Sequence, residues 1–278
     1  MNVDIVLITY NQEKYISEAV DSILMQEVGN DIKLKLIIAD DCSTDNTVDI
    51  ILDKIKILSY PYKILDTTNN LGISKNYKRA FDECDGDYIV ILEGDDYWTS
   101  PYHIENHVRF LNRHRCCSLS MNRLIVKYES NSEFTFYPWN AQEEYVFIDT
   151  KTQIMYGNQL GNLSACVLCT SCVKKIPSSL YELSIADWML GIMLSQYGLL
   201  VLLKEPTSVY RINSRSTWSS LSKEEQHKKL IKSSIDYDTF LNGKFHHYWE
   251  FYRKNLNSKP SFLSKIKRKL KSVMRIIL

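Results

Sequence analysis

Two pairs of adjacent aspartates stand shortly after apolar segments of the chain, where their carboxylates could bind a cation. One pair, Asp40-Asp41, follows residues 34–39, and the other, Asp95-Asp96, follows an uncharged run over residues 88–92. Adjacent carboxylates repel each other, so we expect a positive partner nearby, and hard oxygen ligands suit Mg²⁺ or Mn²⁺. The alternative is a pair of solvated turns, in which aspartate is common. Ligands of open α/β sheets bind where strands end, which favours one shared site.

The apolar segments alternate with amphipathic ones, which predicts an α/β fold. We expect strands at residues 3–9, 34–39, 62–65 and 88–92, and helices at residues 12–26, 48–55, 74–84 and 101–114. Alternation of this kind builds a parallel sheet with right-handed crossovers, so the carboxyl ends of its strands lie along one edge. The second half is more mixed, with strands expected at 118–128, 134–137, 165–169 and 199–203 and helices at 150–156, 186–197 and 223–255.

Four motifs, in a fixed order, are similar to those of one known family. They are Thr9-Tyr10-Asn11, the run 37–45 around Asp40-Asp41, the run 69–74 with the sequence Asn-Asn-Leu-Gly-Ile-Ser, and the run 86–89 that leads into Asp95-Asp96. With these motifs the chain resembles glycosyltransferase family 2, strongly over the segment that holds them and more weakly to about Trp218. The resemblance implies a GT-A fold: a nucleotide-binding, Rossmann-like, mostly parallel sheet flanked by helices, here with a C-terminal helical extension. It also implies an inverting transfer from a nucleotide sugar, expected to be UDP-linked, with Mg²⁺ or Mn²⁺ as cofactor.

The resemblance implies roles for residues around the nucleobase of the donor. Thr9 and Tyr10 would line the nucleotide pocket, Asp41 would hydrogen-bond the base, and Asp40 would support the turn. A plain strand end is the alternative for Thr9 and Tyr10.

The resemblance also implies roles for four residues near the ribose and diphosphate of the donor. Lys75 and Asn76 lie where family members often contact the nucleotide or diphosphate, Asp95 would lie near the ribose, and Asp96 would ligate the metal. A solvated helix face is the alternative for Lys75.

An inverting transfer needs a general base that takes the proton of the acceptor hydroxyl. The run 184–188, Ser-Ile-Ala-Asp-Trp, resembles the acidic-Asp-Trp segment of the family and implies Asp187 as that base. The family often has glutamate before this aspartate, where this chain has Ala186. Helix capping is the alternative for Asp187, because a carboxylate near a helix N-terminus is stabilised by about 0.3–1 kcal/mol.

The run 210–213, Tyr-Arg-Ile-Asn, resembles a family segment that usually ends in histidine. Arg211 could neutralise the charge of the diphosphate, or it could pair with a surface acid. Asn213 is a poorer metal ligand than imidazole, which leaves a third protein ligand open. The Gln-x-x-Arg-Trp signature of processive members is absent, so we expect one sugar per encounter.

Composition and charge narrow the class of protein. The chain has 278 residues, 45% of them apolar, enough for one large domain or a domain with an appendage. Residues 1–257 carry 27 basic and 33 acidic groups, a net charge of about −6, which argues against a nucleic-acid partner. Met1 leads directly into an apolar segment without a secretory signal, and the cysteines number seven, so we expect a cytoplasmic protein.

Cys166, Cys169 and Cys172 are spaced like metal ligands. They lack a fourth ligand at the usual zinc spacing, and two of them fall in an apolar strand pattern, so we expect buried, inert thiols.

The end of the chain is strongly basic. Residues 258–278 hold five lysines, two arginines and no acidic residue, and their apolar residues recur at three- and four-residue steps. This pattern predicts a cationic amphipathic helix on an anionic membrane surface, with a helix docked on the protein body as the alternative. Together with the resemblance, it places the protein at the inner face of the plasma membrane, where it would meet a glycan or lipid-linked glycan acceptor of bacterial surface polysaccharides.

These observations divide the chain into three parts. Residues 1–220 would form the GT-A domain, with 1–115 for the nucleotide sugar and 116–220 for the acceptor; residues 221–257 would form a helical extension and 258–278 the basic helix. Two other classes stay open. A nucleotidyltransferase also needs paired aspartates, but it would show a basic, Gly-rich loop after the first strand, where this chain has Thr9 to Gln12. A non-catalytic sugar-nucleotide-binding protein would work without Asp187.

Overall fold

The computed structural model describes residues 1–130, 133–137, 143–183, 187–213, 218 and 220–257. The chain forms two compact units, one of residues 1–150 with 158–213 and one of residues 151–157 with 214–278. The predicted basic helix at 258–278 lies outside the described residues, as do residues 184–186 in front of Asp187.

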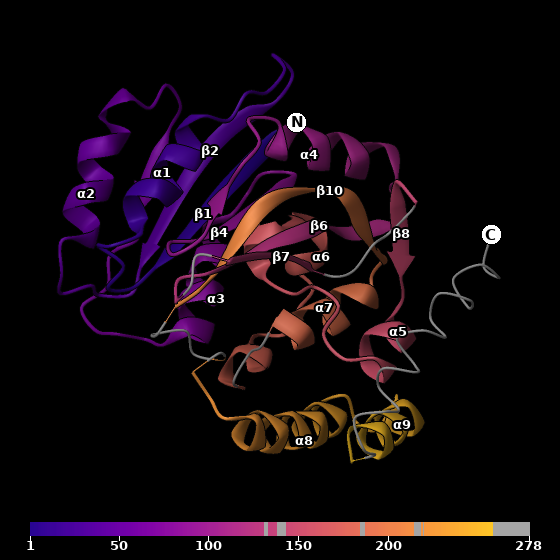
Figure 1. Ribbon diagram of the computed structural model, residues 1–278. Helices are drawn as coiled ribbons and strands as arrows, with labels where there is room; N and C mark the ends of the chain where they lie inside the picture. Colours follow the sequence, from indigo (N-terminus) through magenta and orange to yellow (C-terminus); the bar gives the residue numbers. More distant parts are fainter. Residues whose placement is uncertain (131–132, 138–142, 184–186, 214–217, 219, 258–278) are drawn as a thin grey trace. The chain divides into compact units, whose positions relative to one another are not determined.

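The first four strands of the first unit form a parallel sheet, as predicted (Figure 1). Its central strand β1 (Asn2–Thr9) pairs with β2 (Lys33–Asp40) on one side and with β4 (Tyr88–Glu93) on the other, and β3 (Tyr62–Ile64) pairs with β2. The register sets the last residues of β1 opposite the last residues of β2 and β4. Both aspartate pairs therefore lie at the same edge of the sheet, on either side of β1.

Helices cover both faces of these strands. Successive residues of a strand point to opposite faces of the sheet, and β1, β2 and β4 are apolar on both faces. Helices α1 (Ile16–Leu24), α2 (Thr47–Lys54) and α4 (His103–Arg113) share one hydrophobic core with β1, β2 and β4. Helix α3 (Ile73–Glu83) packs on β1 and β2. The predicted helix at 12–26 is shorter than its pattern, because residues 12–15 form a turn that precedes α1.

The second half of this unit adds mixed pairings. Strand β9 (Cys166–Cys169) runs antiparallel between β4 and β6 (Cys117–Tyr128), and β10 (Leu199–Ile212) runs parallel to β6. The predicted strand at 199–203 is the first part of β10, which continues through a register shift between Leu203 and Ser208. The polar run with Pro206 hides this continuation in the sequence, because proline is tolerated in strands where the ladder is irregular. The second part of β10 brings Arg211 to the carboxyl end of β4.

Short elements complete the unit. Strands β5 (Tyr97–Trp98) and β8 (Tyr145–Ile148) pair with β10, β7 (Glu133–Tyr137) pairs with β6, and helices α6 (Thr170–Val173) and α7 (Asp187–Ser195) follow β9. Strands as short as β5 give no periodic signal, which is why the sequence did not predict it.

The second unit contains helices α8 (Lys223–Phe240) and α9 (His246–Asn257), where the sequence predicted one helical stretch. Ser222 and Glu225 cap α8 reciprocally, and Asn242 and Gly243 take positive φ values between the two helices. Tyr237 and Trp249 are buried in this hairpin. Within the described part of the chain, no helix combines the length and the apolar character needed to cross a membrane.

Candidate active site

A tight turn after β4 carries three acidic residues: Glu93, Asp95 and Asp96. The backbone N–H of Asp96 donates to the carbonyl oxygen of Glu93 over 2.9 Å, and that of Gly94 donates to Ile8 over 2.8 Å. A Cβ at Gly94 would overlap Gln12 Oε1 and lie 2.8 Å from Ile16 Cδ1 and 2.9 Å from Thr9 Oγ1, so a larger residue would have to displace these side chains. We call residues 93–96 the acidic turn.

Asp96 is the buried member of its pair. The residue is 1% exposed, and its carboxylate accepts hydrogen bonds from the Arg211 N–H (2.8 Å), Ser164 Oγ (2.7 Å) and Asn162 Nδ2 (2.9 Å). Burial and the neighbouring charge of Asp95 raise the pKa of Asp96 well above its usual value. Three protein donors occupy most of the acceptor positions of one carboxylate. The metal role of Asp96 stays a prediction, and these contacts show that the carboxylate is held by the protein.

Asp95 is the more open member. It is half-buried, its carboxylate accepts a hydrogen bond from Asn213 Nδ2 over 3.2 Å, and the Gln12 side chain also bonds to it. Burial raises the pKa of Asp95, and the nearby Arg211 partly offsets this rise. Asn213 therefore lies beside the acidic turn. Of the two aspartates, Asp95 is the more exposed.

Asp187 lies close enough to the acidic turn for its charge to act there. It is the first residue of α7 and is half-buried. Burial raises its pKa to about 6, although a hydrogen bond with the Asn158 side chain works in the opposite direction. Its charge, together with those of Asp96 and Asp95, adds to burial in raising the pKa of Glu93. A base is most effective when its pKa is near the working pH, so this carboxylate suits proton transfer near neutrality.

The residues predicted to surround the nucleobase of the donor meet at the ends of β1 and β2. Thr9 is buried and donates to Gln12 Oε1 over 2.8 Å, whereas Tyr10 is 46% exposed. Asp41 accepts from the backbone N–H groups of Leu71 (2.8 Å) and Gly72 (2.9 Å), so it fixes the loop before α3. Each Asp41 oxygen keeps a further lone pair for a ligand.

Asp40 supports its own turn. Its carboxylate accepts hydrogen bonds from the N–H and Oγ of Ser43, the N–H over 2.8 Å. Within this turn, Cys42 has a φ of 67°, a left-handed conformation that is uncommon for a residue other than glycine.

Lys75 and Asn76 make contacts that differ from those predicted. Lys75 forms a surface ion pair with Glu182 over 3.3 Å. Asn76 is buried; its amide donates to the Ala39 carbonyl oxygen over 2.8 Å and accepts from Arg79 Nε over 2.7 Å. These bonds fasten α3 to the end of β2, and they give Asn76 a structural part rather than a free amide for a nucleotide.

Arg211 is committed to protein partners. It is 3% exposed, and its guanidinium donates to the Asp95 carbonyl oxygen over 2.8 Å, to Glu129 over 2.8 Å and to Glu18. It also lies over the rings of Tyr15 and Tyr97. Of the two interpretations of Arg211, pairing with acidic residues is the one the structure supports. Since all its nitrogens are engaged, neutralising a diphosphate would require breaking these bonds.

Four residues of the site gave no signal in the sequence. Gln12 joins Thr9 to Asp95, Asn158 bonds to Asp187, and Asn162 and Ser164 hold Asp96. They belong to no motif, and only the tertiary contacts bring residues 158–164 to the acidic turn.

None of the seven cysteines forms a disulfide. Cys166 and Cys172 are buried and Cys169 is half-buried; burial raises the pKa of Cys169 to about 12 and that of Cys166 well above its usual value. Among the described residues, no group of three or more His, Cys, Asp or Glu side chains is arranged to hold a metal ion. A cation at the acidic turn would therefore need ligands from its substrate or from water.

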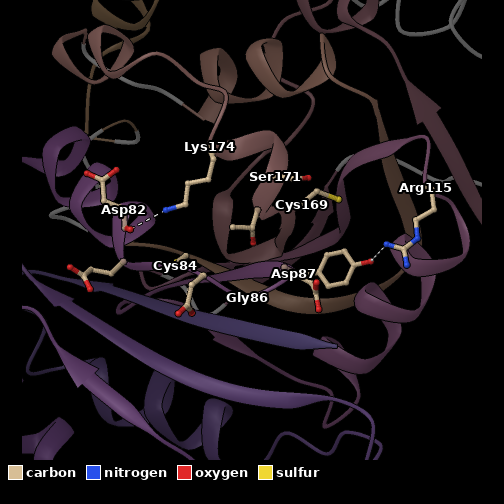
Figure 2. A pocket seen from close by; sticks show the side chains of 12 residues that line it. Asp82, Cys84, Gly86, Asp87, Arg115, Cys169, Ser171 and Lys174 are labelled. Carbon is tan, nitrogen blue, oxygen red and sulfur yellow. Dashed lines mark hydrogen bonds between the residues drawn. The ribbon is translucent and has the colours of Figure 1, made fainter.

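A separate cavity of about 680 Å³ opens at the other end of β4, beside Tyr88 (Figure 2). Lys174 and Arg115 extend toward it from different sides, with Asp87 between them. The Lys174 ammonium donates to the carbonyl oxygens of Phe81 (2.8 Å) and Asp82 (2.9 Å) at the end of α3. Because it lies at the amino end of β4, this cavity is distinct from the acidic turn.

Comparisons with known proteins identify the class of this fold and site. The model of the family described as Glycosyl transferase family 2 matches residues 4–169. An uncharacterized protein of Mycobacterium tuberculosis is 29% identical over 216 residues, which cover 78% of this chain and 60% of that protein. The poly(ribitol-phosphate) beta-N-acetylglucosaminyltransferase TarS of Staphylococcus aureus is 31% identical over 97 residues, 35% of this chain and 17% of TarS. The family model covers more than half of the chain, and the chain belongs to glycosyltransferase family 2.

Solved structures share the fold. The crystal structure of TarS 1–349 from S. aureus has a TM-score of 0.62 at 19% identity and covers 92% of this chain and 71% of that one. The mannosyltransferase PcManGT of Pyrobaculum calidifontis, in complex with GDP-Man and Mn²⁺, has a TM-score of 0.63 at 15% identity, with 97% and 74% covered. The predicted GT-A fold is thus confirmed.

Proposed function

We propose that this protein is an inverting, metal-dependent, non-processive glycosyltransferase that moves one sugar from a nucleotide sugar to an acceptor hydroxyl. The observation that carries the proposal is that the acidic turn, with the half-buried Asp95, and the Asp187 carboxylate, with a pKa of about 6, come together at one end of the parallel strands. The family supplies the reaction class, and this geometry supplies the residues.

A divalent cation fits the chemistry of the acidic turn. Three carboxylates lie within four consecutive residues, and Arg211, the nearby cation, is bound to Glu18 and Glu129. Asp95 would hold the ion, with Asp96 behind it as a buried support. Mg²⁺ and Mn²⁺ often take only one or two protein carboxylates and complete their shell with phosphate oxygens and water. When bound, the ion would stabilise the negative charge of the departing diphosphate.

Asp187 would be the general base of the transfer. The acceptor oxygen forms a bond to the anomeric carbon while the bond to the diphosphate breaks on the opposite face, and the hydroxyl proton passes to the Asp187 carboxylate. One displacement of this kind inverts the anomeric configuration. With a pKa of about 6, Asp187 is mostly ionised at neutral pH and still basic enough to accept the proton.

The donor and the acceptor belong to the proposal as well. A UDP-linked donor is supported by the structure of TarS 1–349 in complex with UDP-GlcNAc, whereas PcManGT was solved with GDP-Man. The chain matches 60% of the length of its mycobacterial relative, so activity, donor and acceptor all remain proposals for this protein. A glycan or lipid-linked glycan of a bacterial surface polysaccharide is the acceptor we propose.

A panel of UDP-, GDP- and dTDP-sugars, each with Mg²⁺, Mn²⁺ or EDTA, tests the reaction class by release of nucleoside diphosphate. We expect release with one donor, abolished by EDTA. Binding of UDP or GDP without turnover would favour a non-catalytic sugar-nucleotide-binding protein. Pyrophosphate released from a nucleoside triphosphate would favour a nucleotidyltransferase.

We also propose that residues 258–278 hold the protein at the inner, cytoplasmic face of the plasma membrane. The support is the density of basic residues, each worth about 1 kcal/mol near an anionic surface. Co-sedimentation of the full chain, and of a chain lacking residues 259–278, with anionic and neutral vesicles tests this. We expect the full chain alone to sediment, and only with anionic vesicles; equal sedimentation of both chains would contradict the proposal.

A further inference from the structure

One short segment of the first unit, residues 158–164, contacts both Asp187 and the acidic turn. At its start, the Asn158 side chain bonds to Asp187, while Asn158 Oδ1 accepts from the N–H of Leu160 over 3.0 Å. The bond to Leu160 engages the oxygen of the amide within the segment itself. The amide of Asn158 is therefore fixed in orientation toward the proposed base.

Four residues later, Asn162 lies between two carboxylates of the acidic turn, those of Glu93 and Asp96. Its Nδ2 donates to Asp96 over 2.9 Å and to Glu93 over 3.0 Å, and its Oδ1 accepts from the N–H of Ser164 over 2.6 Å. Asn162 is buried, so water cannot replace it as a donor. Two carboxylates that repel each other are thus held by the same amide group.

Ser164 completes this arrangement. Its hydroxyl donates to Asp96 over 2.7 Å and accepts from the Glu93 N–H over 3.0 Å, and its carbonyl oxygen accepts from the Trp98 indole over 2.8 Å. Ser164 and Trp98 are both buried. Ser164 therefore bonds to both Glu93 and Asp96 and anchors the segment on Trp98. Asp95 is the one carboxylate of the acidic turn to which neither Asn162 nor Ser164 bonds.

We infer that residues 158–164 are a positioning segment that sets the geometry between the proposed base and the proposed metal carboxylate. Asn158 orients Asp187 on the acceptor side, and Asn162 with Ser164 fixes Glu93 and Asp96 so that Asp95 faces the donor. The inference rests on the proposed function and adds to it that one continuous segment carries the supports of both sides. Groups that hydrogen-bond to a metal ligand commonly contribute about 10–100-fold to metal affinity. Asn162 and Ser164 would act on Asp95 through its neighbours Glu93 and Asp96, so we expect an effect at the lower end of this range.

Two asparagine substitutions in the full-length enzyme separate the two supports. For Asn158→Ala we expect the acid limb of the pH profile of kcat to move upward by roughly one pH unit, because a hydrogen bond to the ionised base is lost. Its half-maximal Mn²⁺ concentration should stay unchanged. For Asn162→Ala we expect that Mn²⁺ concentration to rise about tenfold or more, with the acid limb unchanged.

Control variants keep the test independent of folding. Asn106→Ala is the same substitution at an exposed position of α4 and should change neither quantity. Ser164→Ala removes one bond to Asp96 and should raise the Mn²⁺ requirement even if Asn162→Ala fails to fold. Asn158→Gln, which keeps an amide, should restore part of the acid-limb position. If both segment variants lower kcat without moving either quantity, the segment is only structural and the inference is wrong. Absence of turnover in the unmodified enzyme with every donor would instead contradict the proposed function.

Discussion

Replacing Asp96 should cost stability, whereas replacing Asp95 should cost turnover, and the contrast tests how the structure divides the pair. Asp96→Ala would leave three buried donors, on Arg211, Ser164 and Asn162, without their acceptor. Leaving a buried donor without an acceptor costs about 1–3 kcal/mol. Relief of repulsion with Asp95 works against this, so we expect a loss of about 3 kcal/mol, a large share of the roughly 5–15 kcal/mol that stabilise a typical domain.

Urea unfolding measures the first effect and donor turnover the second. We expect the Asp96→Ala midpoint to fall by about 1 M or more. Asp95→Ala should stay within about 1 kcal/mol of the unmodified protein while losing turnover by about 100-fold or more, since the ion that it holds supplies several kcal/mol to the transition state. The reasoning is refuted if Asp96→Ala keeps its midpoint and loses only its metal dependence.

Three further changes have expected outcomes. Burial holds the pKa of His107 at about 4, below the usual 6.5, so the folded state resists protonation of this imidazole. The free energy of unfolding is therefore unaffected above pH 6.5 and falls between pH 6.5 and pH 4. In urea titrations, the unmodified protein should lose about 3 kcal/mol over that range relative to His107→Gln. Gly94→Ala should cost about 1–3 kcal/mol of unfolding free energy by overlap with Gln12 and should lower turnover; an unchanged midpoint would show that the turn can relax. Cys42→Gly should raise the free energy of unfolding by about 1 kcal/mol by relieving its positive φ, whereas Cys42→Ala should not, and an equal effect of both would rule out backbone strain.

The parallel half of the fold could be predicted because its signals are local. Uncharged runs mark β1, β2 and β4, amphipathic spacing marks the helices between them, and parallel pairing then forces both aspartate pairs to one edge. Strand β10 and the α8–α9 hairpin were harder. A polar run with Pro206 interrupts the strand pattern, and the helical pattern from residue 223 onward masked the turn at Asn242 and Gly243.

The division of labour between adjacent acidic residues could not be predicted. Whether Asp95 or Asp96 is buried depends on Asn162 and Ser164, which lie 66 and 68 residues from Asp96 in the sequence. In the same way, Arg211 is engaged because Glu18 and Glu129, from two other elements, approach it. Spacing identifies which residue types are available, but burial and hydrogen-bond satisfaction decide which of them stays open to a ligand.

The most direct test of the account is Asp187→Asn, measured with the donor that the panel identifies. We expect transfer to fall by about 10²–10⁴-fold, the range typical for loss of a general base, while the Kd of the donor stays close to that of the unmodified enzyme. The unmodified enzyme should show an acid limb of kcat near pH 6, where Asp187 becomes protonated, because the protonated form cannot accept the hydroxyl proton. Full transfer activity in Asp187→Asn would contradict the central claim.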